Sequence, residues 1–178
     1  MHCETAAEGR YLALAGHCGR VSDLVESLAH ELGLDPRRAR AVGVASRLHD
    51  FGKIAVPDEI LLKPGRLTAV ERSVMERHTE VGYELLAETG SSLMDTAALI
   101  ALTHHEHWDG SGYPRGLRGR QIPIEGRIVA VADVYDALTH RRCYRGAFTR
   151  TSAVETVRKG SGGHFDPRVV DAFLRVRP

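Results

Sequence analysis

The sequence predicts an all-α fold, and three observations carry this prediction. Apolar residues recur every three or four positions in most segments, helix-capping patterns precede several apolar runs, and no stretch longer than a few residues alternates as a strand would. With 178 residues, 43% of them hydrophobic, the chain is large enough to bury one core. We therefore expect a single domain over residues 1–178, in which residues 1–15 begin the first helix and no separate regulatory domain is present.

Seven helices are expected from apolar periodicity and capping signals. Their approximate ranges are 12–32, 36–50, 68–89, 93–105, 125–138, a short segment from 152, and 167–174. Gly33, Gly52 and Gly90 follow the first three helices as stop signals. The starts carry two kinds of cap, an aspartate followed by proline or a capping box: Asp35-Pro36, Asp166-Pro167, Thr68-x-x-Glu71 and Ser152-x-x-Glu155.

Two segments between these helices are expected to be irregular. Residues 56–66 hold two prolines and a glycine, which predicts a short helical turn and a loop. Residues 109–123 are rich in glycine and predict a long structured loop with room for a small β-hairpin. Loops of this length in compact domains more often carry function than merely connect elements.

Composition excludes several classes of protein. Lys and Arg number 24 against 23 Asp and Glu, a net charge of +1, which argues against a protein that coats nucleic acid or anionic lipid. The three cysteines, Cys3, Cys18 and Cys143, are widely spaced, which favours a reducing compartment. The most apolar stretch, residues 97–102, is far too short to cross a bilayer, and the N-terminus lacks the apolar core of a secretory signal. We expect a cytoplasmic protein.

Histidine and aspartate stand out at positions where helices end. His49 and Asp50 are neighbours, and neighbours on a helix point about 100° apart, so both reach one metal only where the helix is ending. His104 and His105 splay apart in the same way, which suits two adjacent metal ions. Asp133 lies in an apolar helix, where a charge must be paired or metal-bound.

His17 and His78 lie on other helices and could complete such a site. Taken singly, each is more often a hydrogen-bonded, partly buried histidine than a metal ligand. The conjunction of all these residues is what indicates a metal centre.

Five segments together form a pattern that spans almost the whole chain. They are His17 with Arg20-Val21, Leu48-His49-Asp50-Phe51-Gly52-Lys53-Ile54, Arg77-His78-x-x-x-Gly82, His104-His105-Glu106-x-Trp108-Asp109-Gly110-Ser111-Gly112-Tyr113-Pro114, and Val131-Ala132-Asp133-Val134-Tyr135-Asp136-Ala137-Leu138-Thr139. This pattern resembles the HD-GYP branch of the HD phosphohydrolase superfamily, whose members hydrolyse cyclic di-GMP. The long string that ends in Gly112-Tyr113-Pro114 makes the resemblance specific, because related nucleotide hydrolases lack it.

The resemblance implies a helical bundle whose centre binds two, sometimes three, iron or manganese ions. The implied ligands are His17, His49, Asp50, His78, His104, His105 and Asp133, with Asp50 bridging the metals. Nitrogen and oxygen ligands without thiolate also suit zinc or nickel, so the spacing does not name the metal. A third ion in the family requires a glutamate four residues before the histidine that matches His17. Because Ala13 stands there, we expect two ions.

The resemblance also implies the reaction, hydrolysis of cyclic di-GMP to pGpG or GMP. In a two-metal site, a water that bridges the cations loses a proton near neutral pH and attacks phosphorus without a covalent intermediate. The expected catalytic residues are Asp50, Lys53 and Asp136. The expected substrate-binding residues are Lys53, Tyr113, Arg142 and Arg145.

Other functions remain open on the sequence alone. One alternative is a phosphohydrolase of the wider superfamily that acts on another cyclic dinucleotide or on a nucleotide. Another is a non-catalytic partner of a diguanylate cyclase domain, which the complete set of implied ligands disfavours. Only 16 residues precede His17, so we expect either regulation in trans, by a diguanylate cyclase or by a sensor or receiver protein, or a chain that is part of a larger protein.

Overall fold

The computed structural model describes residues 3–87, 89–140 and 148–176, with the side chains of the first helix described from Gly16 onward. Within these residues the chain is helical and forms no strand, so the all-α prediction is confirmed. The α-helices are α1 (Cys3–Glu31), α2 (Pro36–Ser46), α3 (Asp58–Leu61), α4 (Ala69–Glu76), α5 (His78–Ala87), α6 (Ser92–Thr103), α7 (Ile124–Thr139), α8 (Arg150–Lys159) and α9 (Pro167–Val176). Two 3₁₀ helices, η1 (Phe51–Ala55) and η2 (Gly119–Gln121), lie between them.

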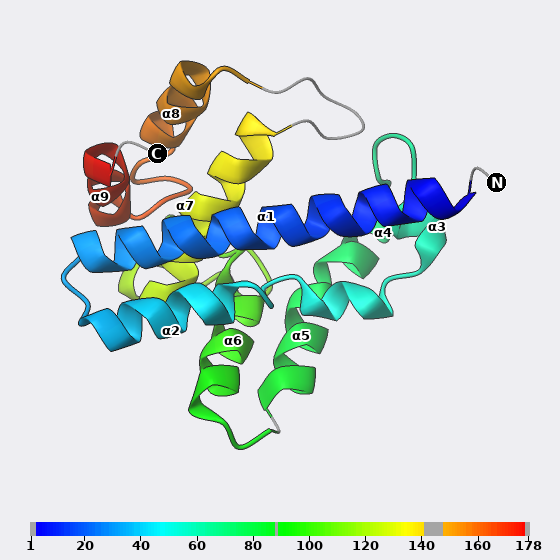
Figure 1. Ribbon diagram of the computed structural model, residues 1–178, viewed down its shortest axis with the longest axis horizontal. Helices are drawn as coiled ribbons and strands as arrows, with labels where there is room; N and C mark the ends of the chain where they lie inside the picture. Colours follow the sequence, from blue (N-terminus) through cyan, green and yellow to red (C-terminus); the bar gives the residue numbers. More distant parts are fainter. Residues whose placement is uncertain (1–2, 88, 141–147, 177–178) are drawn as a thin grey trace.

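The long helix α1 runs along the molecule and packs against α2, α7 and α9 (Figure 1). Helix α2 lies beside α1, α5 and α6 form a neighbouring pair, and α8 and α9 gather near the end of α1. Helix α7 contacts α1, α6, α8 and α9, and its apolar residues Ile128, Val129 and Val131 are fully buried. The core therefore centres on α7, and the residues of α1 and α7 that face each other lie deep in the bundle.

Three of the four predicted caps are confirmed. The Asp35 carboxylate accepts hydrogen bonds from the amides of Arg37 and Arg38 at the start of α2. Thr68 and Glu71 form both halves of a capping box at α4. The Asp166 side chain accepts a hydrogen bond from the amide of Arg168 at the start of α9. These side chains satisfy amides that a helix start leaves without intrahelical partners.

The predicted cap at Ser152 is wrong, because α8 begins earlier. Thr149 is the N-cap, and its hydroxyl accepts a hydrogen bond from the Ser152 amide at 3.2 Å. Ser152 therefore lies inside the first turn of α8. The chain supplies hydroxyl groups three residues apart, at 149 and 152, and the sequence pattern alone does not rank them.

The single helix predicted over residues 68–89 is also wrong, because it breaks at Arg77 into α4 and α5. At the break, the His78 ring nitrogen Nδ1 lies 2.8 Å from the carbonyl oxygen of Met75, and the Thr79 hydroxyl donates to the carbonyl of Glu76. Side chains thus contact the main-chain carbonyl groups at the end of α4. This break and the short helix α3 raise the number of α-helices in the described residues above the predicted seven.

The predicted β-hairpin within residues 109–123 is wrong as well. The Glu106 carboxylate accepts hydrogen bonds from the amides of Arg115 and Leu117, which a hairpin would pair across strands. Gly110, with a φ of +83°, turns the chain in the left-handed region that favours glycine, and η2 follows further along the loop. The loop is folded around a buried carboxylate, so it needs no strand ladder.

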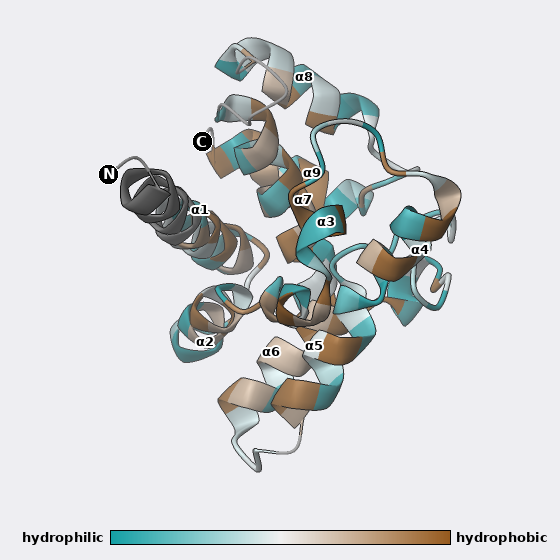
Figure 2. Ribbon diagram, turned by 90° about the vertical axis from the view of Figure 1, so that its right-hand side faces the viewer, coloured by the Kyte–Doolittle hydropathy of each residue, from teal (hydrophilic) through white to brown (hydrophobic). Residues whose placement is uncertain are grey.

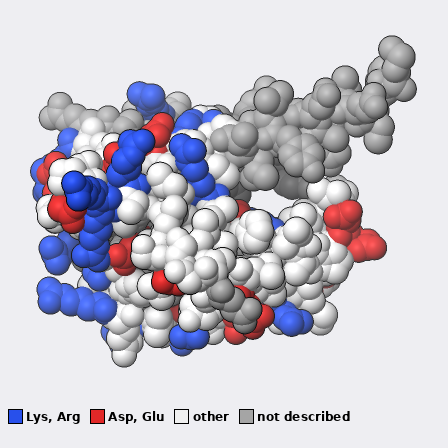
Figure 3. All heavy atoms as spheres, turned by 60° about the horizontal axis from the view of Figure 1, so that its bottom comes forward, with Lys and Arg blue, Asp and Glu red and all other residues white. Residues whose placement is uncertain are grey.

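Hydropathy and charge are distributed as expected for a packed domain. Figure 2 shows α5 and α6 side by side, with apolar residues on both. On the face shown in Figure 3, acidic side chains are interspersed among basic ones, and much of the remaining surface is uncharged. None of the described helices combines the length and apolar character needed to cross a membrane.

Candidate metal centre

The end of α2 delivers His49 and Asp50 to the centre of the molecule. The helix stops at Ser46, and His49 follows in the turn, where its Nδ1 lies 2.7 Å from the carbonyl oxygen of Ser46. Asp50 then precedes η1. The two side chains can point to one place because the helical ladder has ended, as the sequence predicted.

Close packing of η1 against α5 brings Asp50 next to His78. A Cβ atom on Gly52 would lie 2.0 Å from the His78 carbonyl oxygen and 2.5 Å from the Gly82 nitrogen. Only glycine allows this approach of two backbones. Asp50 Oδ1 accordingly lies 3.4 Å from His78 Nε2.

Seven of the predicted residues form two neighbouring clusters. Asp50, His78, His104 and His105 each offer a ligand atom, and these atoms lie within 4.8 Å of one another; His17, His49 and Asp133 do the same. Asp50 faces both clusters, because its Oδ1 lies 3.8 Å from His104 Nε2 while its Oδ2 lies 3.5 Å from His49 Nε2. In the second cluster, Asp133 Oδ1 lies 3.5 Å from His17 Nε2 and 3.9 Å from His49 Nε2.

Four buried atoms in these clusters have no hydrogen-bond partner among the residues that the structure describes: His49 Nε2, Asp50 Oδ1, His78 Nε2 and His104 Nε2. A buried polar atom left unpaired is costly, and such cases in a native fold require an explanation. Two ligand atoms that each lie about 2.1 Å from a shared cation are about 3–3.5 Å apart, which is close to the spacings found here. The residues therefore fit metal ions, which would satisfy all four atoms together.

Hydrogen bonds fix which nitrogen of each imidazole faces the centre. Nδ1 of His78 lies 2.8 Å from a main-chain carbonyl oxygen, and Nδ1 of His104 lies 3.0 Å from two of them. A carbonyl only accepts, so Nδ1 carries a proton, and in the neutral imidazole Nε2 is then the nitrogen with a lone pair directed inward. Neutral imidazoles in this tautomer are ready to bind a cation.

Burial and neighbouring charges favour the same protonation states. Burial lowers the pKa of His49 and of His105, and it lowers the pKa of His78 to about 4. Burial alone would raise the pKa of Asp50, but Lys53 and the neighbouring histidines hold it well below its usual range. Near neutral pH these three histidines are therefore uncharged and the Asp50 carboxylate is ionised.

Two further predicted residues lie beside the clusters. The Lys53 ammonium donates to Asp50 Oδ2, so it stands directly at the carboxylate that faces both clusters. The Tyr113 ring stacks on His105, with centroids 4.8 Å apart and an interplanar angle of 26°. Burial raises the pKa of Tyr113, so its hydroxyl stays protonated and can donate. Arg142 and Arg145 lie outside the described residues.

Asp136, which the sequence predicts to be a catalytic residue, contacts His17 and Arg20 on α1. Its Oδ2 is 2.7 Å from His17 Nδ1, and its Oδ1 accepts from Arg20 Nε at 2.6 Å. Burial alone would raise the pKa of Asp136, but the hydrogen bonds from His17 and Arg20 lower it to about 2. The contacts described for Asp136 are thus with His17, Arg20 and His140, rather than with the other cluster residues.

Sequence reasoning assigned no role to two residues that organise this region. Glu106 is 2% exposed and holds the loop that carries Tyr113, and Arg20 holds Asp136. Arg20 lies three residues after His17, so helical spacing was an available signal for it. Glu106 lies between two histidines in the sequence, which is a signal for a carboxylate near the candidate site. Such a carboxylate, if it is buried, needs hydrogen-bond partners.

The model of the HD domain family matches residues 2–169, so the chain belongs to this family of helical domains. Relatives place it more closely, in the HD-GYP branch that its motifs indicated. It is 51% identical over 158 residues to the cyclic di-GMP phosphodiesterase response regulator RpfG of Xanthomonas campestris, an alignment that covers 89% of this chain and 42% of that protein.

Two further similarities bear on specificity and fold. The chain is 46% identical over 169 residues to 3'3'-cGAMP-specific phosphodiesterase 2 of Vibrio cholerae, which covers 95% of this chain and 32% of that protein. A solved structure of an HDG"Y"P protein from Bdellovibrio bacteriovorus superposes with a TM-score of 0.71 at 21% identity, covering 92% of this chain and 52% of that one. The chain thus spans less than half the length of these two curated relatives, and the solved structure supports the fold.

Proposed function

We propose that this chain is a metal-dependent phosphodiesterase that hydrolyses cyclic di-GMP to pGpG, GMP or both in bacterial second-messenger signalling. The observation that carries the proposal is the convergence of seven histidine and aspartate side chains in two clusters that share Asp50 as a neighbour. The names of relatives up to 51% identical, which are cyclic di-GMP phosphodiesterases, support it.

The proposed centre holds two divalent ions, and iron or manganese are the proposed metals. His78, His104 and His105 would hold one ion, His17, His49 and Asp133 the other, and Asp50 would bridge them. Such a pair supplies an activated water and stabilises the charge that develops on the phosphodiester. Zinc and nickel suit the same nitrogen and oxygen ligands. We expect no third ion because Ala13 offers no ligand atom.

Residues beside the clusters would handle the substrate. Lys53 is positioned to bind a phosphate oxygen or to neutralise the departing 3'-oxygen, since its ammonium lies at Asp50. Tyr113 would donate a hydrogen bond to phosphate from its place over His105. We retain Arg142 and Arg145 as proposed ligands of the second phosphate, because a guanidinium binds phosphate in a fork. For Asp136 the contact with His17 favours a role in orienting that ligand.

Cyclic GMP-AMP is the second candidate substrate. The 46% identical relative from Vibrio cholerae is named as specific for 3'3'-cGAMP, so close relatives differ in the cyclic dinucleotide that they cleave. Comparing kcat/KM for cyclic di-GMP and 3'3'-cGAMP on one preparation decides between them. For the wider setting we propose a cytoplasmic enzyme that acts together with a diguanylate cyclase or with a sensor or receiver protein.

The test combines metal analysis with turnover on one anaerobic preparation. Elemental analysis should find about two ions per chain, and chromatography should show pGpG or GMP formed from cyclic di-GMP after iron or manganese is added. Replacing His49 and Asp50 together by alanine should abolish both metal retention and turnover while the helical circular dichroism persists. The matched control is His107→Ala, a histidine outside both clusters. Normal turnover by the double variant, or a metal-free wild type, would overturn the proposal.

A further inference from the structure

His17 is oriented differently from the other histidines of its neighbourhood. Nδ1 atoms of His49, His78 and His104 lie against main-chain carbonyls, which the helix ends hold rigidly. Nδ1 of His17 instead lies 2.7 Å from a side-chain oxygen, Asp136 Oδ2. The orientation of His17 therefore depends on what holds the Asp136 carboxylate.

Arg20 holds that carboxylate at two points. Its Nε donates to Asp136 Oδ1 at 2.6 Å, and its Nη2 donates to Asp136 Oδ2 at 3.1 Å. A planar guanidinium that binds both oxygens fixes the plane of the carboxylate as well as its position. His140 Nδ1 also lies 3.1 Å from Asp136 Oδ1, but its side chain is 46% exposed and it directly follows α7, the helix that carries Asp136. Arg20 is the contact that reaches across from α1.

Helices α1 and α7 place these residues opposite one another, one turn after the next. His17 and Arg20 lie one turn apart on α1, while Asp133 and Asp136 lie one turn apart on α7. His17 Nε2 faces Asp133 Oδ1 at 3.5 Å, and the next turn supplies the Arg20–Asp136 pair. The inner pair belongs to the metal cluster and the outer pair supports it from behind.

We propose that Arg20 is a positioning residue for the metal subsite made by His17, His49 and Asp133, and that it acts through Asp136. The inference rests on the proposed metal centre. Without Arg20, the Asp136 carboxylate loses its fixed plane, and His17 loses the partner that sets its tautomer and ring angle. The subsite of Asp50, His78, His104 and His105 shares none of these contacts.

The exposure of the Arg20–Asp136 pair allows a positioning role for Arg20 to be distinguished from a contribution to the stability of the fold. The Arg20 side chain is 42% exposed and that of Asp136 is 7% exposed, so solvent screens part of the attraction. Because water can replace the half-exposed guanidinium at the carboxylate, losing Arg20 should cost less folding stability than breaking a fully buried ion pair. Contacts that orient metal ligands, in contrast, typically change metal affinity 10-fold to 100-fold. Removing Arg20 should therefore weaken one metal subsite far more than it weakens the fold.

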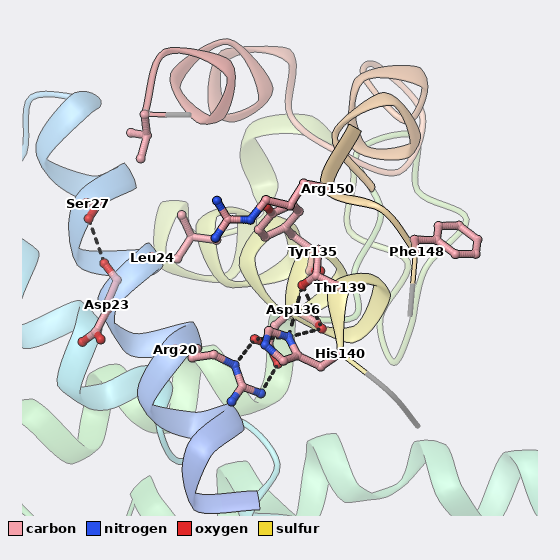
Figure 4. Close-up of a pocket in the computed structure, with 11 residues that line it drawn as sticks. Arg20, Asp23, Leu24, Ser27, Tyr135, Asp136, Thr139, His140, Phe148 and Arg150 are labelled. Atoms are coloured by element: carbon pink, nitrogen blue, oxygen red, sulfur yellow. Dashed lines mark hydrogen bonds and ion pairs between the residues drawn. The ribbon is translucent and has the colours of Figure 1, made fainter. Parts of the chain in front are cut away.

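A cavity beside Arg20 offers a direct way to test the mechanism. It has a volume of about 450 Å³, and Figure 4 shows Arg20, Asp136 and His140 at one side of it, with Arg150 and Tyr135 further along. A small guanidinium ion can enter a space of this size. Methylguanidinium should therefore occupy the position vacated in Arg20→Ala and bind Asp136 in place of the lost side chain.

The primary experiment is a Co²⁺ titration of the metal-free protein, followed by absorption spectroscopy. The wild type should bind two ions in two resolvable steps. Arg20→Ala should weaken one step about 10-fold to 100-fold and leave the other within about twofold. His17→Ala should lose the same step. The control is Arg38→Ala, because Arg38 is also an exposed arginine paired to a carboxylate on α7, that of Glu125, away from the clusters.

Two further results distinguish a role through Asp136 from a merely structural one. Arg20→Ala combined with Asp136→Ala should weaken the step no more than Asp136→Ala alone, and methylguanidinium should restore the affinity of Arg20→Ala but not that of the double variant. Equal affinities for Arg20→Ala and wild type, or equal weakening of both steps, would overturn the inference. Should Arg20→Ala not fold, Arg20→Lys replaces it as the test. Lysine binds the carboxylate at one point only, so a wild-type affinity for both ions in Arg20→Lys would also overturn the inference. A wild type that binds no metal would contradict the proposed function instead.

Discussion

At the scale of single residues, the centre depends on what lies behind each imidazole. His49, His78 and His104 are buried, and each presents Nε2 to the cluster because a main-chain carbonyl accepts the proton on Nδ1. His107 and His164 also lie close together, with ring centroids 3.9 Å apart and ring planes tilted by 43°, but among the described residues they belong to neither cluster. Proximity of histidines is therefore insufficient; their ring nitrogens must be aimed by other groups.

Glu106 is a buried residue whose contribution is to the loop rather than to the clusters. Its two carboxylate oxygens accept from the amides of Arg115 and Leu117 at 2.8 and 2.9 Å. Tyr113 lies just before these residues and stacks on His105. The carboxylate thus connects the position of a proposed substrate ligand to the segment that carries two of the proposed metal ligands.

Glu106→Gln should destabilise the loop while sparing the metals. The amide group of glutamine would face one of the two backbone amides, so a buried donor loses its acceptor and the unfolding free energy should fall by about 1–3 kcal/mol. We also expect a higher KM with two ions still bound. Urea unfolding, elemental analysis and steady-state kinetics check these outcomes. Glu155→Gln, an exposed glutamate paired with Arg158, should leave all three values unchanged. Loss of metal in Glu106→Gln would refute the assigned role.

At the scale of elements, helix ends and close approaches assemble the centre. His104 is the C-cap of α6, His78 is the first residue of α5, and His49 and Asp50 lie in the turn after α2. At each of these positions the direction of the side chain is not restricted to the steps of about 100° of a continuous helix. The approach of η1 to α5 then sets the distance between Asp50 and His78, and Gly52 permits that approach.

Gly52→Ala should disrupt the centre without touching a ligand. The added Cβ would meet two backbone atoms of α5, at 2.0 and 2.5 Å, so η1 must move away and carry Asp50 with it. We expect loss of metal and a fall in unfolding free energy of about 1–3 kcal/mol, as for other overpacking substitutions. Gly19→Ala is the control, because a Cβ there meets no atom within 4 Å and alanine favours a helix. Two ions retained by Gly52→Ala would show that η1 does not set the site.

The sequence was sufficient to predict where helices with clear caps begin and which residues form the two clusters. Asp35 and Thr68 begin their helices as predicted, and the resemblance brought His17, His49, His78 and Asp133 together although they are far apart in the chain. The break at Arg77 was missed because apolar periodicity continues across it, through Val74, Val81 and Leu85. The contacts of Asp136 and Glu106 were missed because they form between segments whose approach only the packed fold defines.

At the scale of the whole molecule, the centre draws one or two side chains from each of five segments. They come from α1, the turn after α2, α5, the end of α6 and α7. Because these segments also enclose the hydrophobic core, ions bound here would connect most of the bundle. Ions that bind the folded state alone stabilise it according to their concentration relative to Kd.

Metal removal should therefore lower the melting temperature of the entire domain. With Mn²⁺ at about 100 times Kd, one site contributes about 2.7 kcal/mol, and a domain of this size gains roughly 2–4 °C for each kcal/mol. Adding Mn²⁺ to chelator-treated protein should thus raise Tm by about 5–10 °C for each such site, in a single transition followed by circular dichroism. The variant with alanine at His49 and Asp50 should show no such rise, since it lacks the residue that faces both clusters and one ligand of the second. An equal rise in that variant would place the stabilising ions elsewhere on the surface. A rise confined to the wild type, with one cooperative transition, would mean that the clusters and the core fold as one unit.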